Sequence, residues 1–484
     1  MTARIMSGSA PDLSVSDSRP QVNGVGKDRF LLIVTVGWFL VTFVRIQDIL
    51  PFLKVFVLGM LSTLGVMTAV TLRVKEAPWS DIILRCMLIL LFGVCTGVAY
   101  ATNTFWLFTD FITLLNYLFV FMMAMPILAK NPYCLRILIK LVAGSAFVTA
   151  VWGVTHGGHG QGSWLGDEND VALWLNIGTP FCYFAARSAK TRLERYFLLT
   201  TAAFCAVATI ASFSRGGFVG LVTGVFAIGL FSRKSLKVLT ITTLVGLAAL
   251  PILASLHPPE HRGKSRPYLE ELFSMNDKKD STRMERIYTW TGGWVMYKAN
   301  PIFGIGAGNY PYALPHYEDD PELRALNVFN RSFGGRQTHS SYFEMLSELG
   351  SVGAICFFIM WGAVFRRSWR LSQTPQTHPL GHIAAGVGAG LLAYSACCAF
   401  VSSFYYPPFW LLCGFACMMR LDLAREPSTH PAALPRRKNA SKAGIRTRPS
   451  GQQASGKPAV TDSAQIVAER APRPAYYFRQ YPSL

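Results

Sequence analysis

Long apolar runs separated by short polar connections fill most of the chain, from Phe30 to Leu423. A run of about 20 apolar residues has the length at which a helix crosses a lipid bilayer. Because lipid offers the backbone no hydrogen-bond partner, such runs form helices. The pattern predicts an all-α, polytopic transmembrane bundle of about twelve spans. We expect these spans at residues 30–50, 51–72, 82–101, 107–128, 135–155, 169–186, 196–213, 216–231, 236–256, 342–365, 381–401 and 405–423.

Two segments interrupt this rhythm, and they differ in composition. The first mixes aromatic, glycine and charged positions, which predicts a large, partly helical loop between the ninth and tenth spans. The second is rich in Pro, Ser and basic residues, which predicts a disordered basic tail. The predicted domains are a polar lead-in, spans one to nine, the large loop, spans ten to twelve and the tail, at 1–29, 30–256, 257–339, 340–423 and 424–484.

Composition and charge agree with a membrane protein. Hydrophobic residues make up 51% of the chain and charged residues only 15%, a balance unlike that of soluble domains. Lys and Arg gather in alternate connections between spans, whereas the short connections on the opposite side hold only Arg45, Lys54 and Arg215. Because cytoplasmic loops retain positive charge, both termini are predicted to be cytoplasmic and the large loop to lie outside. The net charge of +19 then reflects topology and the tail, not nucleic-acid binding.

The large loop contains two patterns of its own. In DSTRMERIYTWTGGWVMY, the pair Thr282 and Glu285 has capping-box spacing, and Ile287, Trp290 and Trp294 share one helical face. This predicts an amphipathic helix on the outer membrane surface. The following NPIFGIGAGNY is glycine-rich, but no strand precedes it, so it predicts a turn and not a nucleotide-binding loop.

Arg215 stands between two apolar spans in SFSRGGFVG. A guanidinium close to lipid is costly, so it is a functional candidate, although it could equally snorkel to lipid phosphates. The neighbouring Gly216 allows close approach of a backbone or ligand, and the helix that begins here offers N–H groups to an anion. These neighbours favour an anion-binding role.

Arg283 and Arg286 lie near the start of the predicted loop helix. Arg336 lies near the C-terminal end of the large loop. Each could simply be solvated, and Arg283 competes with Arg286 for any role. Guanidiniums that converge at the outer membrane face would suit a diphosphate, whose oxygens accept the planar fork of Arg.

In FGGRQTHSSYFEMLSELG, His339 lies where the loop meets the tenth span. A neutral imidazole can accept a proton from an attacking hydroxyl; alternatively, His339 caps the helix together with Ser340 and Ser341. Glu344 and Glu348 share a helical face, so one could orient the imidazole, or both could pair with Arg inside the bundle.

THGGHGQGSWLGDENDVALWLN, residues 155–176, is a further polar cluster on the outer side. Two imidazoles in a glycine-rich loop are weak evidence for a metal, so no metal site is expected. The ten cysteines lie in or beside spans and show no zinc or disulfide pattern. Asn169 or Asp170 is expected to cap the sixth span, and a carbohydrate contact by the loop, including Asp167, is the second interpretation.

SFSRGGFVG, ERIYTWTGGWVMYKANPIFGIGAGN and THSSYFEMLSELGSVG, in this order around one large outer loop, resemble the O-antigen ligase superfamily of bacterial polytopic glycosyltransferases. GDENDVALWLN looks like the matching segment of the O-glycosylation ligase-like branch. The resemblance covers roughly residues 167–401 and implies a GT-C-like helical fold.

The resemblance implies transfer of a glycan from undecaprenyl diphosphate to a lipid A-core sugar or a protein hydroxyl, at the periplasmic face of the inner membrane, in lipopolysaccharide or polysaccharide biosynthesis. It implies no metal, cofactor or nucleotide sugar. Arg215 and Arg286 would hold the diphosphate and His339 would activate the acceptor. Two alternatives stay open: a polymerase that joins repeat units on the carrier, and a polysaccharide transporter or flippase.

Overall fold

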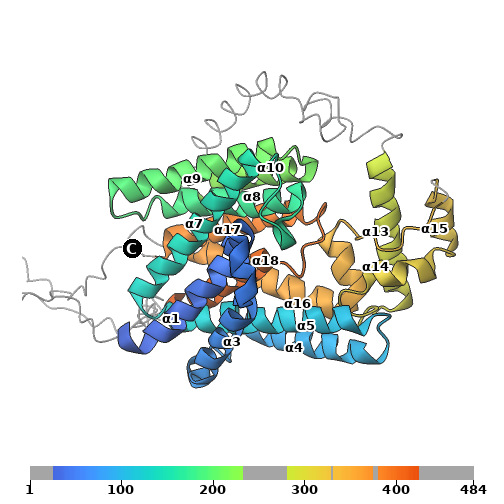
Figure 1. Ribbon diagram of the computed structural model, residues 1–484, viewed down its shortest axis with the longest axis horizontal. Helices are drawn as coiled ribbons and strands as arrows, with labels where there is room; N and C mark the ends of the chain where they lie inside the picture. The colour runs from blue at the N-terminus through green and yellow to red at the C-terminus, as the bar shows by residue number, and fades with distance from the viewer. Residues whose placement is uncertain (1–24, 233–280, 329–330, 374–379, 424–484) are drawn as a thin grey trace, which may run out of the picture. The chain divides into compact units, whose positions relative to one another are not determined.

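The computed structural model describes residues 25–232, 281–328, 331–373 and 380–423, and every regular element in them is helical (Figure 1). This confirms the predicted all-α class for that part of the chain. The ninth predicted span, most of the lead-in and the tail lie outside the described residues. The α-helices are α1 (Val25–Phe39), α2 (Ile46–Ile49), α3 (Leu58–Thr71), α4 (Ile82–Thr96), α5 (Thr104–Tyr117), α6 (Met125–Leu128), α7 (Pro132–Thr155), α8 (Glu168–Ala185), α9 (Arg192–Ala211), α10 (Arg215–Phe231), α13 (Ser281–Ala299), α14 (Tyr310–Ala313), α15 (Pro321–Leu326), α16 (Ser341–Ser372), α17 (Gly381–Cys397) and α18 (Pro407–Leu423).

Shorter turns of other pitch connect or extend these helices. The π-helical turn η6 joins α5 to α6, so that one helix runs from Thr104 to Leu128. The π-helical and 3-10 segments are η2 (Leu40–Val44), η3 (Pro51–Phe56), η4 (Val74–Glu76), η5 (Gly97–Ala99), η6 (Leu118–Ala124), η7 (Ser163–Leu165) and η10 (Leu314–Tyr317).

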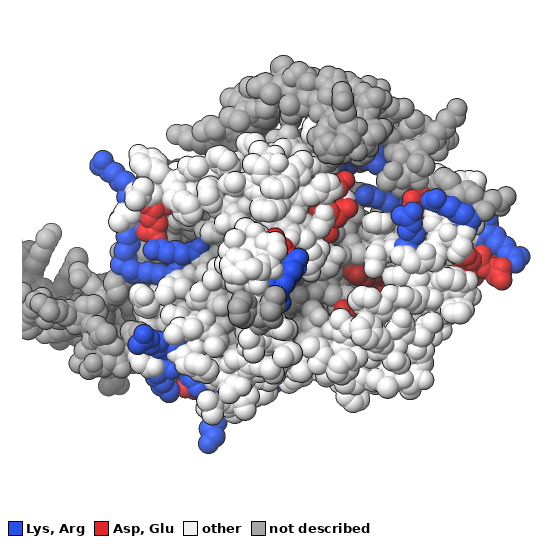
Figure 2. Space-filling model, viewed as in Figure 1, with Lys and Arg blue, Asp and Glu red and all other residues white. Residues whose placement is uncertain are grey.

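Each predicted span that falls on described residues contains a helix. By length and composition, five described helices can cross a membrane, namely Ile82–Ala99, Thr104–Leu128, Pro132–Thr155, Arg192–Ala211 and Ser341–Ser372. Three shorter apolar helices accompany them, Leu58–Thr71, Arg215–Phe231 and Gly381–Cys397. Most of the face drawn in Figure 2 is neither acidic nor basic, as expected for a surface in contact with lipid. The total of twelve spans stays a prediction.

Helix α8 is buried over nearly its whole length and packs against α7, α9, α10 and α17. Small residues bring α10 close to it, because a Cβ on Gly220 would stand only 2.6 Å from Asn176 Nδ2. Asn176 Nδ2 also donates a hydrogen bond of 2.7 Å to the carbonyl oxygen of Gly217. The start of α10 is therefore fixed against α8.

The segments predicted to share the cytoplasmic side contact one another. Arg73 donates to Asp28 at 2.7 Å and to Glu76 at 2.9 Å, and Lys130 Nζ lies 3.5 Å from a Glu76 oxygen. These residues come from α1 and from two separate connections. The grouping agrees with the predicted topology, while which side faces the cytoplasm stays a prediction.

The segments predicted to lie outside also contact one another. Trp164 Nε1, from the predicted outer connection before α8, donates to the carbonyl oxygen of Thr42 in the first predicted span at 2.9 Å. The Asn103 backbone N–H donates to Asn309 Oδ1 at 2.6 Å. The second bond ties the connection before α5 to the segment that follows α13. Positions far apart in sequence thus contact one another on the side predicted to be external.

Helix α16 is broken at Gly350, whose φ of 60° and ψ of −156° are not helical. The glycine-rich turn fills the break: Ile305 N donates to Ser347 O at 2.9 Å, and Ser351 N donates to Pro301 O at 2.8 Å. Backbone groups that the break leaves without helical partners are therefore bonded. The turn predicted for NPIFGIGAGNY is confirmed, and it anchors the described loop elements to α16.

The helix predicted after the capping box is confirmed as α13, although the side chain of Thr282 lies outside the described part. Its buried face carries Tyr288 and Met296. On the face predicted to be apolar, Trp290 stacks on Phe343 and Trp294 is 43% exposed. Packing against α16 and α15 selects the buried face; contact of α13 with the membrane stays a prediction.

Candidate functional site

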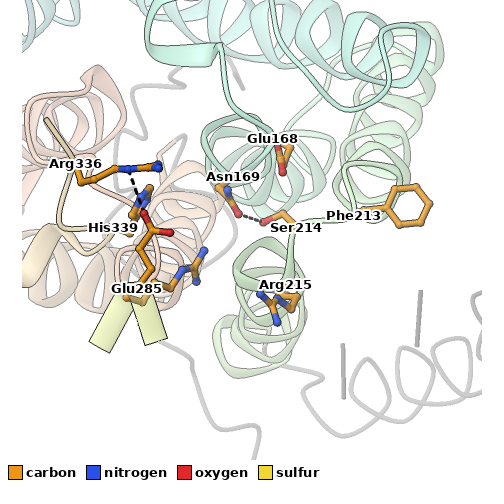
Figure 3. Close-up of a pocket in the computed structure, with 9 residues that line it drawn as sticks. Glu168, Asn169, Phe213, Ser214, Arg215, Glu285, Arg336 and His339 are labelled. Carbon is orange, nitrogen blue, oxygen red and sulfur yellow. Dashed lines mark hydrogen bonds and ion pairs between the residues drawn. The ribbon is translucent and has the colours of Figure 1, made fainter. Parts of the chain in front are cut away.

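A cavity of about 290 Å³ lies between the N-termini of α8 and α10 on one side and α13 with the segment before α16 on the other. In Figure 3, Ser214 and Arg215 lie across the cavity from His339 and Glu285. Its lining consists of Glu168, Asn169, Phe213, Ser214, Arg215, Glu285, Arg286, Arg336 and His339. We call it the arginine cavity. It brings together four residues that the sequence singles out, three arginines and His339.

The α8 and α10 side of the arginine cavity is built by a chain of short hydrogen bonds. Ser214 is the N-cap of α10: its Oγ accepts from Gly217 N at 2.9 Å and donates to Asn169 Oδ1 at 2.6 Å. Asn169 Nδ2 donates to Asp167 Oδ1 at 2.6 Å. The two helix N-termini are therefore locked together.

The predicted cap of the sixth span is wrong. Asp167, not Asn169 or Asp170, is the N-cap of α8, because its side chain accepts from the Asn169 backbone N–H at 2.7 Å. The helix begins at Glu168, one residue before the predicted span. This displacement by one residue releases the Asn169 side chain to bond Ser214.

Arg215 is the first residue of α10 and lines the arginine cavity. The N-terminus of a helix carries partial positive charge, which adds to the guanidinium in attracting an anion. Gly216 does not line the cavity; it is buried, and a Cβ there would stand 2.7 Å from the Cβ of Phe400. Gly216 thus allows Phe400 to pack against the start of α10.

Arg286 and Glu285 supply the α13 side of the cavity. The Arg286 guanidinium carbon lies 5.7 Å from the centre of the Phe400 ring, within cation–π range. Glu285 Oε1 lies 3.2 Å from Arg336 Nε and its other oxygen lies 3.7 Å from Arg331. Glu285 therefore ties Arg336 and the loop before α16 to α13.

His339 occupies a left-handed backbone conformation with φ of 50°, which is uncommon for a residue with a Cβ. Its neighbours are held on both sides: Thr289 donates to the Thr338 carbonyl oxygen at 3.1 Å, and Thr338 bonds Ser402 at 2.7 Å. Ser340 is the N-cap residue of α16. The alternative in which His339 caps the helix is therefore wrong; His339 precedes the cap and lines the cavity.

Burial lowers the pKa of His339 below its ordinary value of 6.5, and the charge of Arg286 lowers it further. Asp167 and Glu285 act in the opposite direction but do not reverse the shift. The imidazole is consequently neutral at pH 7 and can accept a proton.

A second cavity, of about 300 Å³, adjoins the first and shares Arg215 and Arg286 with it. Its remaining lining consists of Arg283, Ile287, Trp290 and Phe400. We call it the apolar cavity, since hydrocarbon and aromatic groups make up most of this remainder. Arg283 thus lies with the apolar cavity and not with His339.

Glu344, from the first turn of α16, lines neither cavity. Its Oε2 accepts from Phe404 N at 3.0 Å. Glu348 accepts from Gly308 N at 2.8 Å and from Tyr310 N at 2.9 Å. The two predicted alternatives were that one Glu orients the imidazole or that both pair with Arg. Instead, both side chains accept hydrogen bonds from backbone N–H groups.

Sequence reasoning missed Asn169, Glu285 and Phe400 as parts of the site. The first two were assigned to caps, because Asn and Glu near a helix start are common in such roles. Phe400 carries no sequence signal, since one more aromatic residue near a span is unremarkable.

Residues 200–358 match the family model described as O-Antigen ligase. This match supports the O-antigen ligase superfamily for that part of the chain. Arg215, Arg286 and His339 all lie inside the matched residues, whereas Asp167 and Asn169 lie before them. No curated protein matches the chain.

The match confirms the resemblance predicted from the motifs. Together with the apolar helices, it identifies a multi-pass membrane protein of the ligase and polymerase type of glycosyltransferase. Lipid-linked glycans and membrane lipids are the substrates and surroundings that the family implies.

Proposed function

We propose that the protein is a ligase that transfers a glycan from undecaprenyl diphosphate to an acceptor hydroxyl at the periplasmic face of the inner membrane. The observation that carries the proposal is the arginine cavity, which places Arg215, Arg286 and His339 around one space. Cationic groups and a neutral base are the two functions that this transfer requires.

The donor diphosphate would lie between Arg215 and Arg286. Two guanidiniums can form bidentate bonds with phosphate oxygens, and the N-terminus of α10 adds backbone N–H groups. Both arginines also line the apolar cavity, where Trp290 and Phe400 offer hydrocarbon surface. The first isoprene units of the carrier would lie there, so that the lipid end and the charged end bind in adjoining spaces.

His339 would act as the general base. The acceptor hydroxyl oxygen attacks the anomeric carbon of the donor sugar, and its proton passes to the neutral imidazole. The bond between the anomeric carbon and the phosphate oxygen breaks, and undecaprenyl diphosphate leaves with the electron pair. The arginines stabilise the charge that develops on the leaving group, so the proposal requires no metal ion.

The acceptor is a lipid A-core sugar or a protein hydroxyl. Either would reach His339 from the side of the segment before α16. A repeat-unit polymerase would use the same arginines and base, but its acceptor would be another carrier-linked sugar. A transporter or flippase would not need a base at His339.

The deciding measurement is the length of the glycan left on the carrier in cells without the protein and in cells that express Arg215→Ala or His339→Ala. We expect full-length polymer stranded on the carrier in all three, with both variants inserted in normal amounts. Single repeat units on the carrier would assign the polymerase reaction instead. Normal transfer by His339→Ala would contradict the general-base role.

A further inference from the structure

A third cavity, of about 270 Å³, is lined in part by the segment before α16. Gly335 and Gln337 line this third cavity, whereas Arg336 and His339 line the arginine cavity. One stretch of chain therefore contributes to the walls of both cavities. The lining of the third cavity consists of Trp106, Asp110, Gly308, Pro311, Tyr312, Gly335, Gln337, Glu344, Glu348, Ser402, Tyr405 and Tyr406.

Aromatic rings form part of its wall. Trp106 of α5 and Tyr312 of α14 are stacked, with ring centres 6.2 Å apart and an angle of 21° between the planes. They are 40% and 37% exposed, so ring surface remains open. The rings of Tyr405 and Tyr406 line the same space. Flat aromatic surface that carries polar groups at its edge suits the apolar face of a pyranose ring.

Carboxyl groups supply the acceptors. Glu344 is 6% exposed, and its Oε2 is bonded to Phe404 N; no described residue donates to its Oε1 or to either oxygen of Asp110. Glu348 is already bonded to Gly308 N and Tyr310 N, so it holds the turn in place. Sugar hydroxyls can donate to such carboxyl oxygens.

The described lining of the third cavity contains carboxyl groups but no Lys or Arg, whereas three arginines line the arginine cavity. A diphosphate binds through cationic groups, so this lining offers the charged end of the donor no such partner. Among the described residues, no group of three His, Cys, Asp or Glu is placed to hold a metal ion. The hollow on the face drawn in Figure 2 shows acidic atoms surrounded by uncharged surface. A ligand with hydroxyl groups and an apolar face fits this lining, and a sugar has both.

We propose that the third cavity is a glycan subsite that holds one pyranose ring of the donor or of the acceptor next to the segment that carries His339. The proposal rests on the proposed function, since it assigns a sugar of that reaction to the subsite. Trp106 and Tyr312 pack against the ring, while Asp110 and Glu344 accept from its hydroxyls.

The test measures binding to the purified protein in detergent with three probes: undecaprenyl diphosphate, undecaprenyl diphosphate linked to N-acetylglucosamine, and core oligosaccharide from the lipopolysaccharide of the host strain. The variants are Trp106→Ala, Asp110→Asn and Glu344→Gln. Their matched controls are Trp79→Ala, Asp319→Asn and Glu322→Gln, at exposed positions away from the cavity. Trp106 is partly exposed, so its replacement tests the subsite without disturbing the buried core.

We expect the variants to weaken binding of one sugar-bearing probe by about three- to tenfold while binding of undecaprenyl diphosphate and the controls are unchanged. Weakening of the N-acetylglucosamine probe assigns the subsite to the donor, and weakening of the core oligosaccharide assigns it to the acceptor. Unchanged affinity for both probes in all three variants overturns the subsite. Arg215→Ala should weaken both lipid probes; if it does not, the proposed function fails independently of the subsite.

Discussion

At the scale of single residues, His339 and Arg286 are coupled. The two side chains line one cavity, and the charge of Arg286 is the second cause, after burial, of the low pKa of His339. A general base works only when it is unprotonated. Arg286 therefore has two effects in the proposed reaction: it holds the leaving group and it keeps the base neutral.

The pH dependence of transfer follows from this coupling. Because the pKa of His339 lies below 6.5, the rate should be constant at neutral pH and fall only on acidification through that pKa. Arg286→Ala removes a cause of the lowering, so the acid limb of the profile should move to higher pH. The measurement is kcat/KM against pH in proteoliposomes. An acid limb that stays in place would contradict the coupling.

Arg286→Lys tests the geometry of the contact rather than its charge. Lysine keeps the positive charge but loses the planar fork that bonds two phosphate oxygens, so we expect a loss of transfer of at least about tenfold. Arg324→Lys, at a position where the side chain is 67% exposed, is the matched control and should retain full activity. Wild-type transfer by Arg286→Lys would reduce the residue to a general positive charge.

At the scale of elements, the break in α16 connects the membrane helix to the loop. The glycine-rich turn bonds to both sides of Gly350, and Glu348 bonds the turn further along at Gly308 and Tyr310. A helix with a gap in its own hydrogen bonds is stable only when another segment supplies them. The break thus positions the turn, and the turn positions one wall of the third cavity.

Gly350→Ala should lower stability markedly. At this backbone conformation a Cβ is strained, and it would stand 2.5 Å from the Ile302 carbonyl oxygen, so we expect a loss of at least about 1–3 kcal/mol. The control is Gly362→Ala in the same helix, where a Cβ meets nothing within 4 Å and alanine favours the helix. Thermal unfolding in detergent measures both. Equal melting temperatures for the two variants would contradict the close docking of the turn.

At the scale of the whole molecule, a buried ion pair also holds the helical bundle together. Neither of its residues lines the arginine cavity. Arg367 donates from both terminal nitrogens to Asp81, each at 2.9 Å, and also to the Ala416 carbonyl oxygen at 3.0 Å. Asp81 is fully buried. These bonds join α4, α16 and α18, so the helix that follows His339 is fixed to its neighbours at its other end.

Arg367→Ala should destabilise the bundle strongly, because it leaves Asp81 buried without its main partner, at a cost of about 3–5 kcal/mol. The neighbouring Arg366 is exposed, and Arg366→Ala should leave stability within about 0.5 kcal/mol of the wild type. Thermal unfolding and the amount of inserted protein provide the two measurements. A wild-type melting temperature for Arg367→Ala would show that Arg420, which lies 3.6 Å from Asp81, replaces it.

Features that depend on composition and local periodicity could be predicted from the amino-acid sequence. Apolar run length predicted the helices, since a bilayer imposes one length on every span. Glycine content predicted the turn between α13 and α14. Motif order indicated the family, and three residues singled out from it, Arg215, Arg286 and His339, line one cavity.

Which residues line that cavity depends on contacts that form only in the folded chain. Glu344 follows His339 by five positions, yet it lines a different cavity. Asn169 joins the site because α8 begins one residue earlier than predicted and α10 lies beside it. Such contacts link segments far apart in sequence, and local pattern carries no information about which distant partner a side chain will find.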